Sequence, residues 1–252
     1  MAAPVVLITG ASAGLGAEFA RQLSKRGHRL VLAARRTDRL EALAGELGNA
    51  RALTADLGKP GAAARLIAEI EQAGETVDLL INNAGFGLHG RVADLDPAKQ
   101  RAMIDLNCGA LFDLARAVLP AMVERKSGRI LNVASTAAFQ PGPGMAVYFA
   151  TKAFVLSFSE ALHEEVKPHG IKVSALCPGP TRTEFGAVAG FGEEGSFDRL
   201  SMDSPTVVRV ALRGLERNKA VVIPGIVNKT GAVSSRFVPR ALVRKIAGAL
   251  KF

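Results

Sequence analysis

The chain has 252 residues, 48% of them hydrophobic and 22% charged, a composition typical of a globular protein large enough to bury its own core. With only two cysteines it is not a disulfide-rich secreted scaffold, and no apolar run approaches the roughly 20 residues of a bilayer-spanning helix. The first residues, MAAPVVLITG, place no basic segment before the short apolar stretch, so we expect no signal peptide and a cytoplasmic protein.

The net charge of +9 is concentrated at the C-terminal end. Residues 205–252 contain ten Lys or Arg and a single acid, which leaves the first 204 residues balanced. A basic chain can indicate a nucleic-acid partner, but one Tyr and no Trp provide few rings on which bases would stack. We therefore expect no nucleic-acid partner.

Short apolar, β-branched runs alternate with helical stretches along the whole chain. The first predicted helices cover residues 15–26 and 39–47. Strands of this kind, separated by helices, indicate a parallel sheet covered on both faces. We predict a single doubly wound, Rossmann-like α/β domain over residues 1–252, with a parallel sheet of about seven strands and helices on both faces. The predicted strands are residues 5–9, 30–33, 51–54, 77–81, 129–133, 172–176 and 220–223.

Two glycine-bearing stretches interrupt this alternation. Residues 139–144 precede a predicted helix, and residues 185–204 mix four glycines with Phe191, Phe197 and Met202. A loop with apolar anchors suits a substrate cover, so residues 185–204 are predicted to form a lid. The alternative is a solvated surface loop.

The first predicted strand runs directly into a glycine-rich turn and then a helix. Gly10 permits the tight turn, while Gly14 and Gly16, on either side of Leu15, allow a pyrophosphate to approach the helix N-terminus. Between the first strand and the first helix of an α/β chain, this spacing predicts dinucleotide binding. The alternative is a plain turn.

Two arginines follow the second predicted strand, where dinucleotide-binding folds contact the adenosine ribose. Ala34 is followed by Arg35 and Arg36, so no acid is present to accept the ribose hydroxyls as in NAD-binding proteins. Guanidinium groups bind phosphate bidentately, and the Ser12 hydroxyl would donate to the same phosphate. The pattern favours NADP(H); the alternative is a helix start that merely carries basic residues.

Tyr148, the only tyrosine in the chain, and Lys152 lie one turn apart on a predicted helix and share a face. A free phenol, with a pKa near 10, is a poor acid or base at neutral pH, and a nearby ammonium is expected to lower that pKa. Ser135, thirteen residues before Tyr148 at a strand end, is placed to hold a substrate oxygen beside the phenol.

Together these residues resemble the short-chain dehydrogenase/reductase family over essentially the whole chain. The matching motifs occur in the family's order and at its spacing. They are Thr9-Gly10-x-x-x-Gly14-x-Gly16, Asp56-Leu57, Asn82-Asn83-Ala84-Gly85, Asn107, Ser135, Tyr148-x-x-x-Lys152, and Pro178-Gly179 followed by Thr183.

The resemblance implies an NADP(H)-dependent oxidoreductase that interconverts a carbonyl and an alcohol, with Asn107, Ser135, Tyr148 and Lys152 as catalytic residues. Lys152 would also bond the nicotinamide ribose, and Asn107 would bind a water that connects Lys152 to solvent. The other implied contacts are Asp56 and Leu57 with the adenine, Asn83, Ala84 and Gly85 with the cofactor and the central strand, and Pro178, Gly179, Thr181 and Thr183 with the nicotinamide carboxamide.

The resemblance also implies a homodimer or homotetramer built through the helices around residues 107–123 and 148–167. A competing hypothesis is a non-enzymatic reader of NADP(H) that serves as a redox sensor or regulator, although a pure binder has no use for a tuned phenol. The four histidines share no ligand spacing, so no metal is expected.

The predicted substrate pocket is apolar, with no charged residue evidently aimed at a substrate carboxylate. This favours a hydrophobic small molecule, such as a ketoacyl, steroid-like or other lipophilic ketone. The expected lining is Phe86, Leu88, Phe139, Pro141, Met145, Phe185 and Phe191.

Residues 236–252 form a predicted basic amphipathic helix, in which Leu242, Ile246 and Leu250 make one apolar stripe. Such a helix can contact an anionic membrane peripherally, or guide an acyl carrier or a coenzyme A thioester to the pocket. In the remaining alternative the stripe packs on the body or on a neighbouring subunit. The cations around the stripe are Arg240, Arg244, Lys245 and Lys251.

Overall fold

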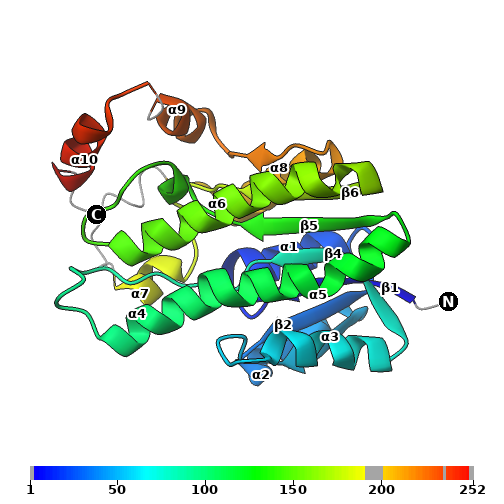
Figure 1. Cartoon of the computed structure of the whole chain (residues 1–252). Coiled ribbons are helices and arrows are strands. Elements are labelled where there is room, and N and C mark those ends of the chain that lie inside the picture. Colours follow the sequence, from blue (N-terminus) through cyan, green and yellow to red (C-terminus); the bar gives the residue numbers. More distant parts are fainter. Residues whose placement is uncertain (1–2, 191–200, 235–236, 250–252) are drawn as a thin grey trace.

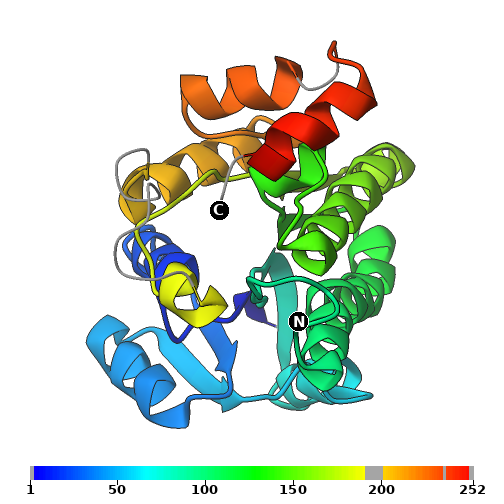
Figure 2. The ribbon, with the colours of Figure 1, turned by 90° about the vertical axis from the view of Figure 1, so that its left-hand side faces the viewer.

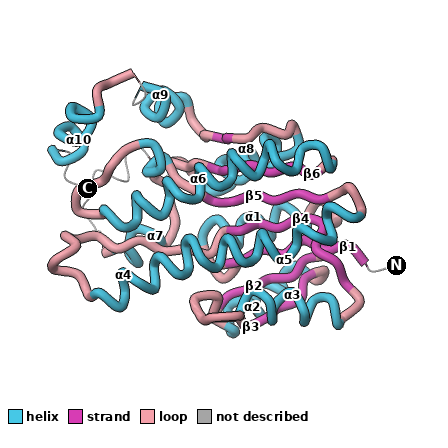
Figure 3. The backbone as a smooth tube through the Cα atoms, viewed as in Figure 1, coloured by secondary structure: helices cyan, strands magenta, loops and turns pink. Residues whose placement is uncertain are grey.

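The computed structural model describes residues 3–190, 201–234 and 237–249, and their strands form one parallel sheet (Figures 1 and 3). The strand order is β3-β2-β1-β4-β5-β6-β7. This confirms the predicted doubly wound α/β fold. The strands are β1 (Ala3–Thr9), β2 (Leu30–Ala34), β3 (Ala50–Thr54), β4 (Glu75–Asn82), β5 (Gly128–Val133), β6 (Ile171–Leu176) and β7 (Val221–Val222).

Helices cover both faces of the sheet because successive side chains of each buried strand point to opposite faces. In β1, Val5 and Leu7 join one core cluster, whereas Val6 and Ile8 join the other. Figure 2 shows the two helical layers on either side of the strands. The first cluster is covered by α3 (Ala62–Gln72), α5 (Leu111–Glu124) and α6 (Ala146–Val166), and the second by α1 (Gly14–Ser24), α2 (Thr37–Leu47) and α8 (Ser204–Glu216).

The topological switch point of the sheet lies between β1 and β4: β2 and β3 extend the sheet on one side of β1, and β4 to β7 extend it on the other. β1 pairs with β2 on one side and with β4 on the other, with Val6 opposite Leu30 and Leu79 respectively. In open parallel sheets a crevice forms at such a switch point, beyond the carboxyl ends of the strands. This topology positions the site described below.

An irregular helical run leads into the core. α4 (Pro97–Ile104) continues through a π-helical turn (Asp105–Ala110) into α5. By length and composition, the run from Pro97 to Glu124 is apolar enough to cross a membrane. Leu114 and Met122 of α5 are nonetheless fully buried against the sheet, as in the core helix of a globular domain.

The C-terminal segment extends beyond the sheet as α9 (Ile226–Ser234) and α10 (Arg240–Ala249) (Figure 1). α10 buries Ala247, while Leu242 and Ile246 are about half exposed, at 49% and 50%. The two described residues of the predicted apolar stripe are therefore only half covered within this chain. Leu250 and Lys251 lie outside the described residues.

The predicted lid is described only at its two ends. Its first residues form the short helix α7 (Phe185–Ala189), and Met202 bridges back to Thr181. Residues 191–200, which include Phe191 and Phe197, lie outside the described part of the chain.

Candidate active site

The turn after β1 brings the backbone close to its neighbours, which only glycine permits. Gly10 has φ +63°, in the left-handed region, and a Cβ on Gly16 would collide with the Gly10 carbonyl oxygen. α1 begins at Gly14, and its N-cap residue Ala13 makes no side-chain hydrogen bond, so the first helical N–H groups have no side-chain cap.

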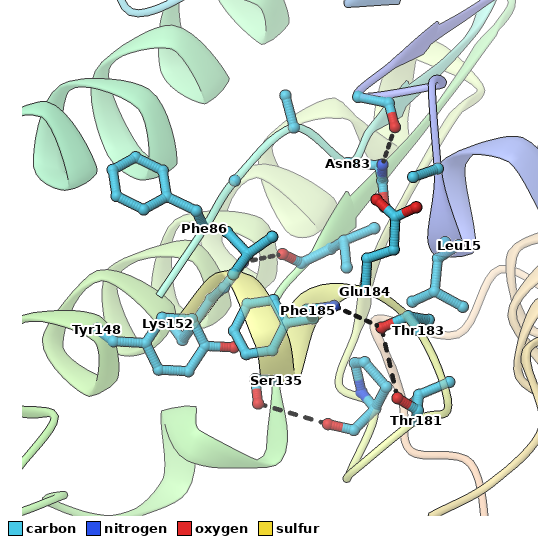
Figure 4. Close-up of a pocket in the computed structure, with 18 of the residues that line it drawn as sticks. Leu15, Asn83, Phe86, Ser135, Tyr148, Lys152, Thr181, Thr183, Glu184 and Phe185 are labelled. Carbon is cyan, nitrogen blue, oxygen red and sulfur yellow. Dashed lines mark hydrogen bonds between the residues drawn. The ribbon is translucent and has the colours of Figure 1, made fainter. Parts of the chain in front are cut away.

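Hydrogen bonds between the ends of β1 and β4 fix this turn. The Thr9 hydroxyl accepts from the backbone N–H groups of Asn83 and Ala84, both at 3.0 Å. In return, the Asn83 side-chain amide donates to the Thr9 carbonyl at 2.9 Å and to the Gly10 carbonyl at 3.3 Å. Figure 4 shows Asn83 at this end of the cavity. The glycine turn is therefore held in shape by residues 73 to 75 positions further along the chain.

Basic side chains gather at the carboxyl end of β2. Arg35 and Arg36 line the cavity that opens there, and the Arg36 Nε donates to the Ser12 Oγ at 3.2 Å. Arg36 Nη1 also bonds Glu184 Oε2 at 3.1 Å, and Arg39 Nη1 bonds Glu184 Oε1 at 2.7 Å. Glu184 and Arg39 are residues that sequence reasoning missed.

Tyr148, Lys152 and Ser135 meet at the other end of the cavity (Figure 4). α6 supplies Tyr148 and Lys152, both buried, and the lysine Nζ donates to the Val133 carbonyl at 2.8 Å. Ser135 follows β5, where its hydroxyl accepts from the Ala137 N–H at 3.1 Å and is hydrogen-bonded to Tyr148. The three groups that the sequence predicted to act together are adjacent.

Burial controls the ionisation of this group. It raises the pKa of Tyr148 to about 12, although the hydrogen bond with Ser135 opposes the shift. Burial also lowers the pKa of Lys152 to about 8. In this structure desolvation outweighs the predicted lowering of the tyrosine pKa by Lys152, whose ammonium lies 5.8 Å from the centre of the ring. The phenol is held in its protonated form at neutral pH.

Asn107 lies within the π-helical turn, behind the cavity wall. Its side-chain Oδ1 accepts from the Phe86 N–H at 3.0 Å, and its Nδ2 donates to the Phe86 carbonyl at 2.9 Å and to the Thr151 hydroxyl at 3.1 Å. These bonds hold the segment after β4 in place, so Asn107 does not bond its own helix in the way the sequence left open. Its contact with a relay water stays a prediction.

The loop after β6 closes the third side of the cavity. The Thr183 side chain packs close to Gly14, and a Cβ added to that glycine would lie 3.3 Å from it. The Thr183 hydroxyl accepts from the Phe185 N–H at 3.2 Å. The Phe185 ring lies 5.4 Å from the ring of Tyr148, between centroids. Thr181, in turn, donates to the Gly179 carbonyl at 3.0 Å.

A single cavity of about 550 Å³ joins all these groups. Gly16 and Asn107 lie just behind its wall. Of the predicted substrate contacts, Phe86, Met145 and Phe185 line this cavity. The prediction for Phe139 was wrong, because this residue lines a separate cavity near β7. Leu88 and Pro141 are not part of the lining. The other predicted residues in the lining are Gly10, Ser12, Gly14, Leu15, Arg35, Arg36, Asp56, Leu57, Asn83, Ala84, Gly85, Ser135, Tyr148, Lys152, Pro178, Gly179, Thr181 and Thr183.

These features fit a phosphorylated dinucleotide. The side-chain-free turn and the helix N-terminus suit a pyrophosphate, while the arginines and Ser12 suit a further phosphate. Among the described residues, no group of three or more His, Cys, Asp or Glu is placed to hold a metal ion.

Residues 4–192 match the family model described as short chain dehydrogenase. The chain belongs to the short-chain dehydrogenase/reductase family. An NADP-dependent 3-hydroxy acid dehydrogenase of Salmonella typhi is 40% identical over 199 residues, covering 75% of this chain and 78% of the relative.

Two solved structures extend this likeness over nearly the whole dehydrogenase. A short-chain dehydrogenase from Sphingobium yanoikuyae in complex with NADPH superposes with a TM-score of 0.83 at 38% identity, covering 98% of this chain and 95% of the other. A bulky-bulky ketone specific alcohol dehydrogenase from Comamonas testosteroni gives 0.79 at 33% identity, covering 94% and 93%.

This dehydrogenase is therefore an NADP(H)-dependent oxidoreductase that acts on hydroxyl or carbonyl groups. The family, the reaction class and the cofactor predicted from the sequence are confirmed. The comparisons give no support to the competing hypothesis of a non-enzymatic NADP(H) reader.

Proposed function

We propose that this enzyme interconverts a lipophilic ketone and the corresponding secondary alcohol, with Tyr148 as the acid–base residue. The bound cofactor supplies or accepts the hydride. In reduction, the Tyr148 hydroxyl gives its proton to the carbonyl oxygen, which the Ser135 hydroxyl holds in place. Lys152 stabilises the phenolate that remains. Oxidation of the alcohol follows the same path in reverse.

The proposed orientation of NADP(H) follows from the two ends of the cavity. The 2′-phosphate lies at Arg35, Arg36 and Ser12, and the pyrophosphate lies at the glycine turn. The nicotinamide then reaches Tyr148 and Lys152. The 3.2 Å hydrogen bond between Arg36 and Ser12 supports this placement, because it brings two phosphate-binding groups to one point.

The observation that carries the proposed substrate class is the apolar surface around the Tyr148 hydroxyl. Phe86, Met145, Phe149 and Phe185 line the cavity near the phenol and belong to one apolar cluster with it. An apolar surface of this kind binds a hydrocarbon or aromatic group beside the reacting carbonyl. Arg182 also lines the cavity, and it is the group that a substrate carboxylate would require.

The test compares matched substrates in steady-state assays of NADPH consumption. We expect kcat/KM for a bulky aromatic or alicyclic ketone to exceed that for a short 3-oxo acid by at least about tenfold, since one extra buried apolar group is worth roughly 1–3 kcal/mol. A preference for the acid that disappears in Arg182→Ala would overturn the lipophilic assignment and leave the reaction class intact.

We further propose that the enzyme is a homodimer or homotetramer assembled through α5 and α6. Support comes from Phe112 and Phe154, which are exposed on these two helices and both pack against Phe158 at 5.9 Å between ring centroids. An exposed aromatic cluster on adjacent helices suits a second copy of the chain. Sedimentation velocity should show a dimer or larger for the wild type and a smaller species for Phe112→Ser/Phe154→Ser.

We also propose that α9 and α10 contact an anionic membrane surface peripherally. Support comes from the exposure of Ile226 and Phe237, each 82% exposed, and from the exposed stripe of Leu242 and Ile246. Exposed cations accompany these apolar groups, a combination that suits the interface of an anionic bilayer. They are Lys229, Arg240, Arg244 and Lys245.

A further inference from the structure

Glu184 occupies the donors that a phosphate would use. Its two carboxylate oxygens are shared between Arg36, at 3.1 Å, and Arg39, at 2.7 Å. These hydrogen bonds, that from Arg39 first, hold the pKa of Glu184 below its usual range, so the group is an anion at neutral pH. A carboxylate bonded to two guanidinium groups resembles the arrangement in which arginines hold a phosphate.

The same residue belongs to the loop that reaches the catalytic end. Glu184 is the N-cap residue of α7, and it directly follows Thr183, which lies against Gly14. The next residue, Phe185, places its ring 5.4 Å from that of Tyr148 (Figure 4). A displacement of the Glu184 carboxylate therefore alters how the N-terminus of α7 is held. The first residue of that helix, Phe185, contacts the catalytic tyrosine.

A 2′-phosphate and Glu184 require the same positive groups. Arg36 is bonded to Ser12 through Nε and to Glu184 through Nη1, so a phosphate bound at Ser12 meets the Glu184 carboxylate across one guanidinium. Two anions at this separation repel each other, and the repulsion is absent for a cofactor without the 2′-phosphate. This step rests on the proposed placement of the 2′-phosphate at Arg35, Arg36 and Ser12.

We propose that Glu184 is a specificity-determining residue that competes with the 2′-phosphate for Arg36. Binding of NADP(H) displaces the carboxylate from Arg36 and leaves Arg39 as its partner, which changes how the N-terminus of α7 is held. Binding of NAD(H) leaves the ion pairs in place. Glu184 thus weakens binding of NADP(H) but not of NAD(H). It also couples binding of the 2′-phosphate to the position of the Phe185 ring beside Tyr148.

The test measures dissociation constants of NADPH and NADH by fluorescence titration of Glu184→Gln. We expect the NADPH constant to fall by about 2- to 10-fold, the range for loss of one or two exposed ion pairs, and the NADH constant to change by less than about 2-fold. Glu46→Gln is the matched control, because the Arg21–Glu46 pair has the same exposures, 42% and 49%, as the Arg36–Glu184 pair. This control should leave both constants unchanged.

Arg36→Ala, alone and combined with Glu184→Gln, separates failure of this inference from failure of the proposed cofactor placement. Arg36→Ala should weaken NADPH binding and leave NADH binding unchanged. In the Arg36→Ala background, Glu184→Gln should increase NADPH affinity by less than it does in the wild type. If Arg36→Ala leaves the preference intact, the phosphate lies elsewhere and the placement is wrong. If Arg36→Ala behaves as expected but Glu184→Gln leaves NADPH binding unchanged or weaker, then Glu184 does not compete, and the inference is overturned.

Discussion

At the scale of single residues, the catalytic end combines a buried neutral phenol with a buried lysine. With its pKa raised to about 12, the Tyr148 phenol carries a proton at neutral pH but is a weak acid, so proton transfer to a carbonyl requires stabilisation of the phenolate that forms. In the oxidative direction Tyr148 must first lose its proton, and the resulting phenolate requires a nearby positive charge. The Lys152 ammonium, 5.8 Å from the centre of the ring, supplies it. The hydrogen bond to the Val133 carbonyl fixes the position of that ammonium.

Tyr148→Phe should lower turnover by about 10²–10⁴, the usual contribution of a general acid, while NADPH still binds. The ring contacts with Phe149 and Phe185 are retained in this variant, so the fold is spared. Steady-state turnover and NADPH titration together provide the measurement. Near-normal turnover would show that another group donates the proton.

The residues that sequence reasoning found differ from those it missed in one respect. Gly10, Ser135, Tyr148 and Lys152 carry a local signature, since each lies at a strand end or on a helix turn of known spacing. Glu184 carries none, because its partners Arg36 and Arg39 lie 148 and 145 positions earlier in the chain. An acid directly after Thr183, in the loop that lines the cavity, was the available signal.

At the scale of elements, the strands were predictable because each is a short apolar run set by burial on both faces. The π-helical turn at Asp105–Ala110 was not, since the weak helix formers Asn107, Cys108 and Gly109 indicate an irregularity in a helix but not its type. The orientation of α10 was not predictable either. Ala247 faces the body and Leu242 faces outward, a choice set by the surface that the helix meets and not by its own pattern.

The proposed membrane contact of α10 is tested by sedimentation with vesicles. We expect the enzyme to pellet with anionic vesicles at low salt and to stay in solution with neutral vesicles or at high salt. Leu242→Ser/Ile246→Ser should lose this binding without unfolding, because both side chains are half exposed. Val92→Ser, an exposed apolar change elsewhere, is the control.

Two results would contradict the membrane proposal. One is equal recovery of the wild type in solution under every condition. The other is binding to an acidic acyl carrier protein, lost in the same double variant, with no binding to vesicles. The second result would assign α10 to a protein partner.

At the scale of the whole molecule, the burial of ionisable groups makes stability depend on alkaline pH. Cys177 follows β6 and is fully buried, and burial raises its pKa from 9.0 to about 12. The folded state therefore keeps this proton when the unfolded chain has lost it. The stabilisation is complete below about pH 9 and is lost as the pH rises toward 12.

Cys177→Ala should remove this dependence. Between about pH 8 and pH 10.5, the wild type should lose about 2 kcal/mol more unfolding free energy than the variant, as the linkage relation gives for this shift. Denaturant unfolding at the two pH values measures the difference. Ser174→Ala, a buried change in β6 without a titrating group, should shift both values equally. An unchanged difference in Cys177→Ala would show that the thiol ionises without unfolding.

The pairing of β1 with β4 at the centre of the sheet also sets the order in which the chain folds. Val6 faces Leu79, so the β4 side of β1 stays unpaired until roughly 70 further residues have been synthesised, about 4–14 s at ordinary ribosomal rates. Tyr148 and Lys152 are synthesised later still. The cofactor site, which combines the glycine turn with these two residues, is therefore incomplete during most of synthesis. The apolar residues of β1 are therefore without their β4 partner for seconds in each round of synthesis. We expect protection of residues 3–9 by a chaperone, more than the stability of the finished fold, to limit the yield of active enzyme.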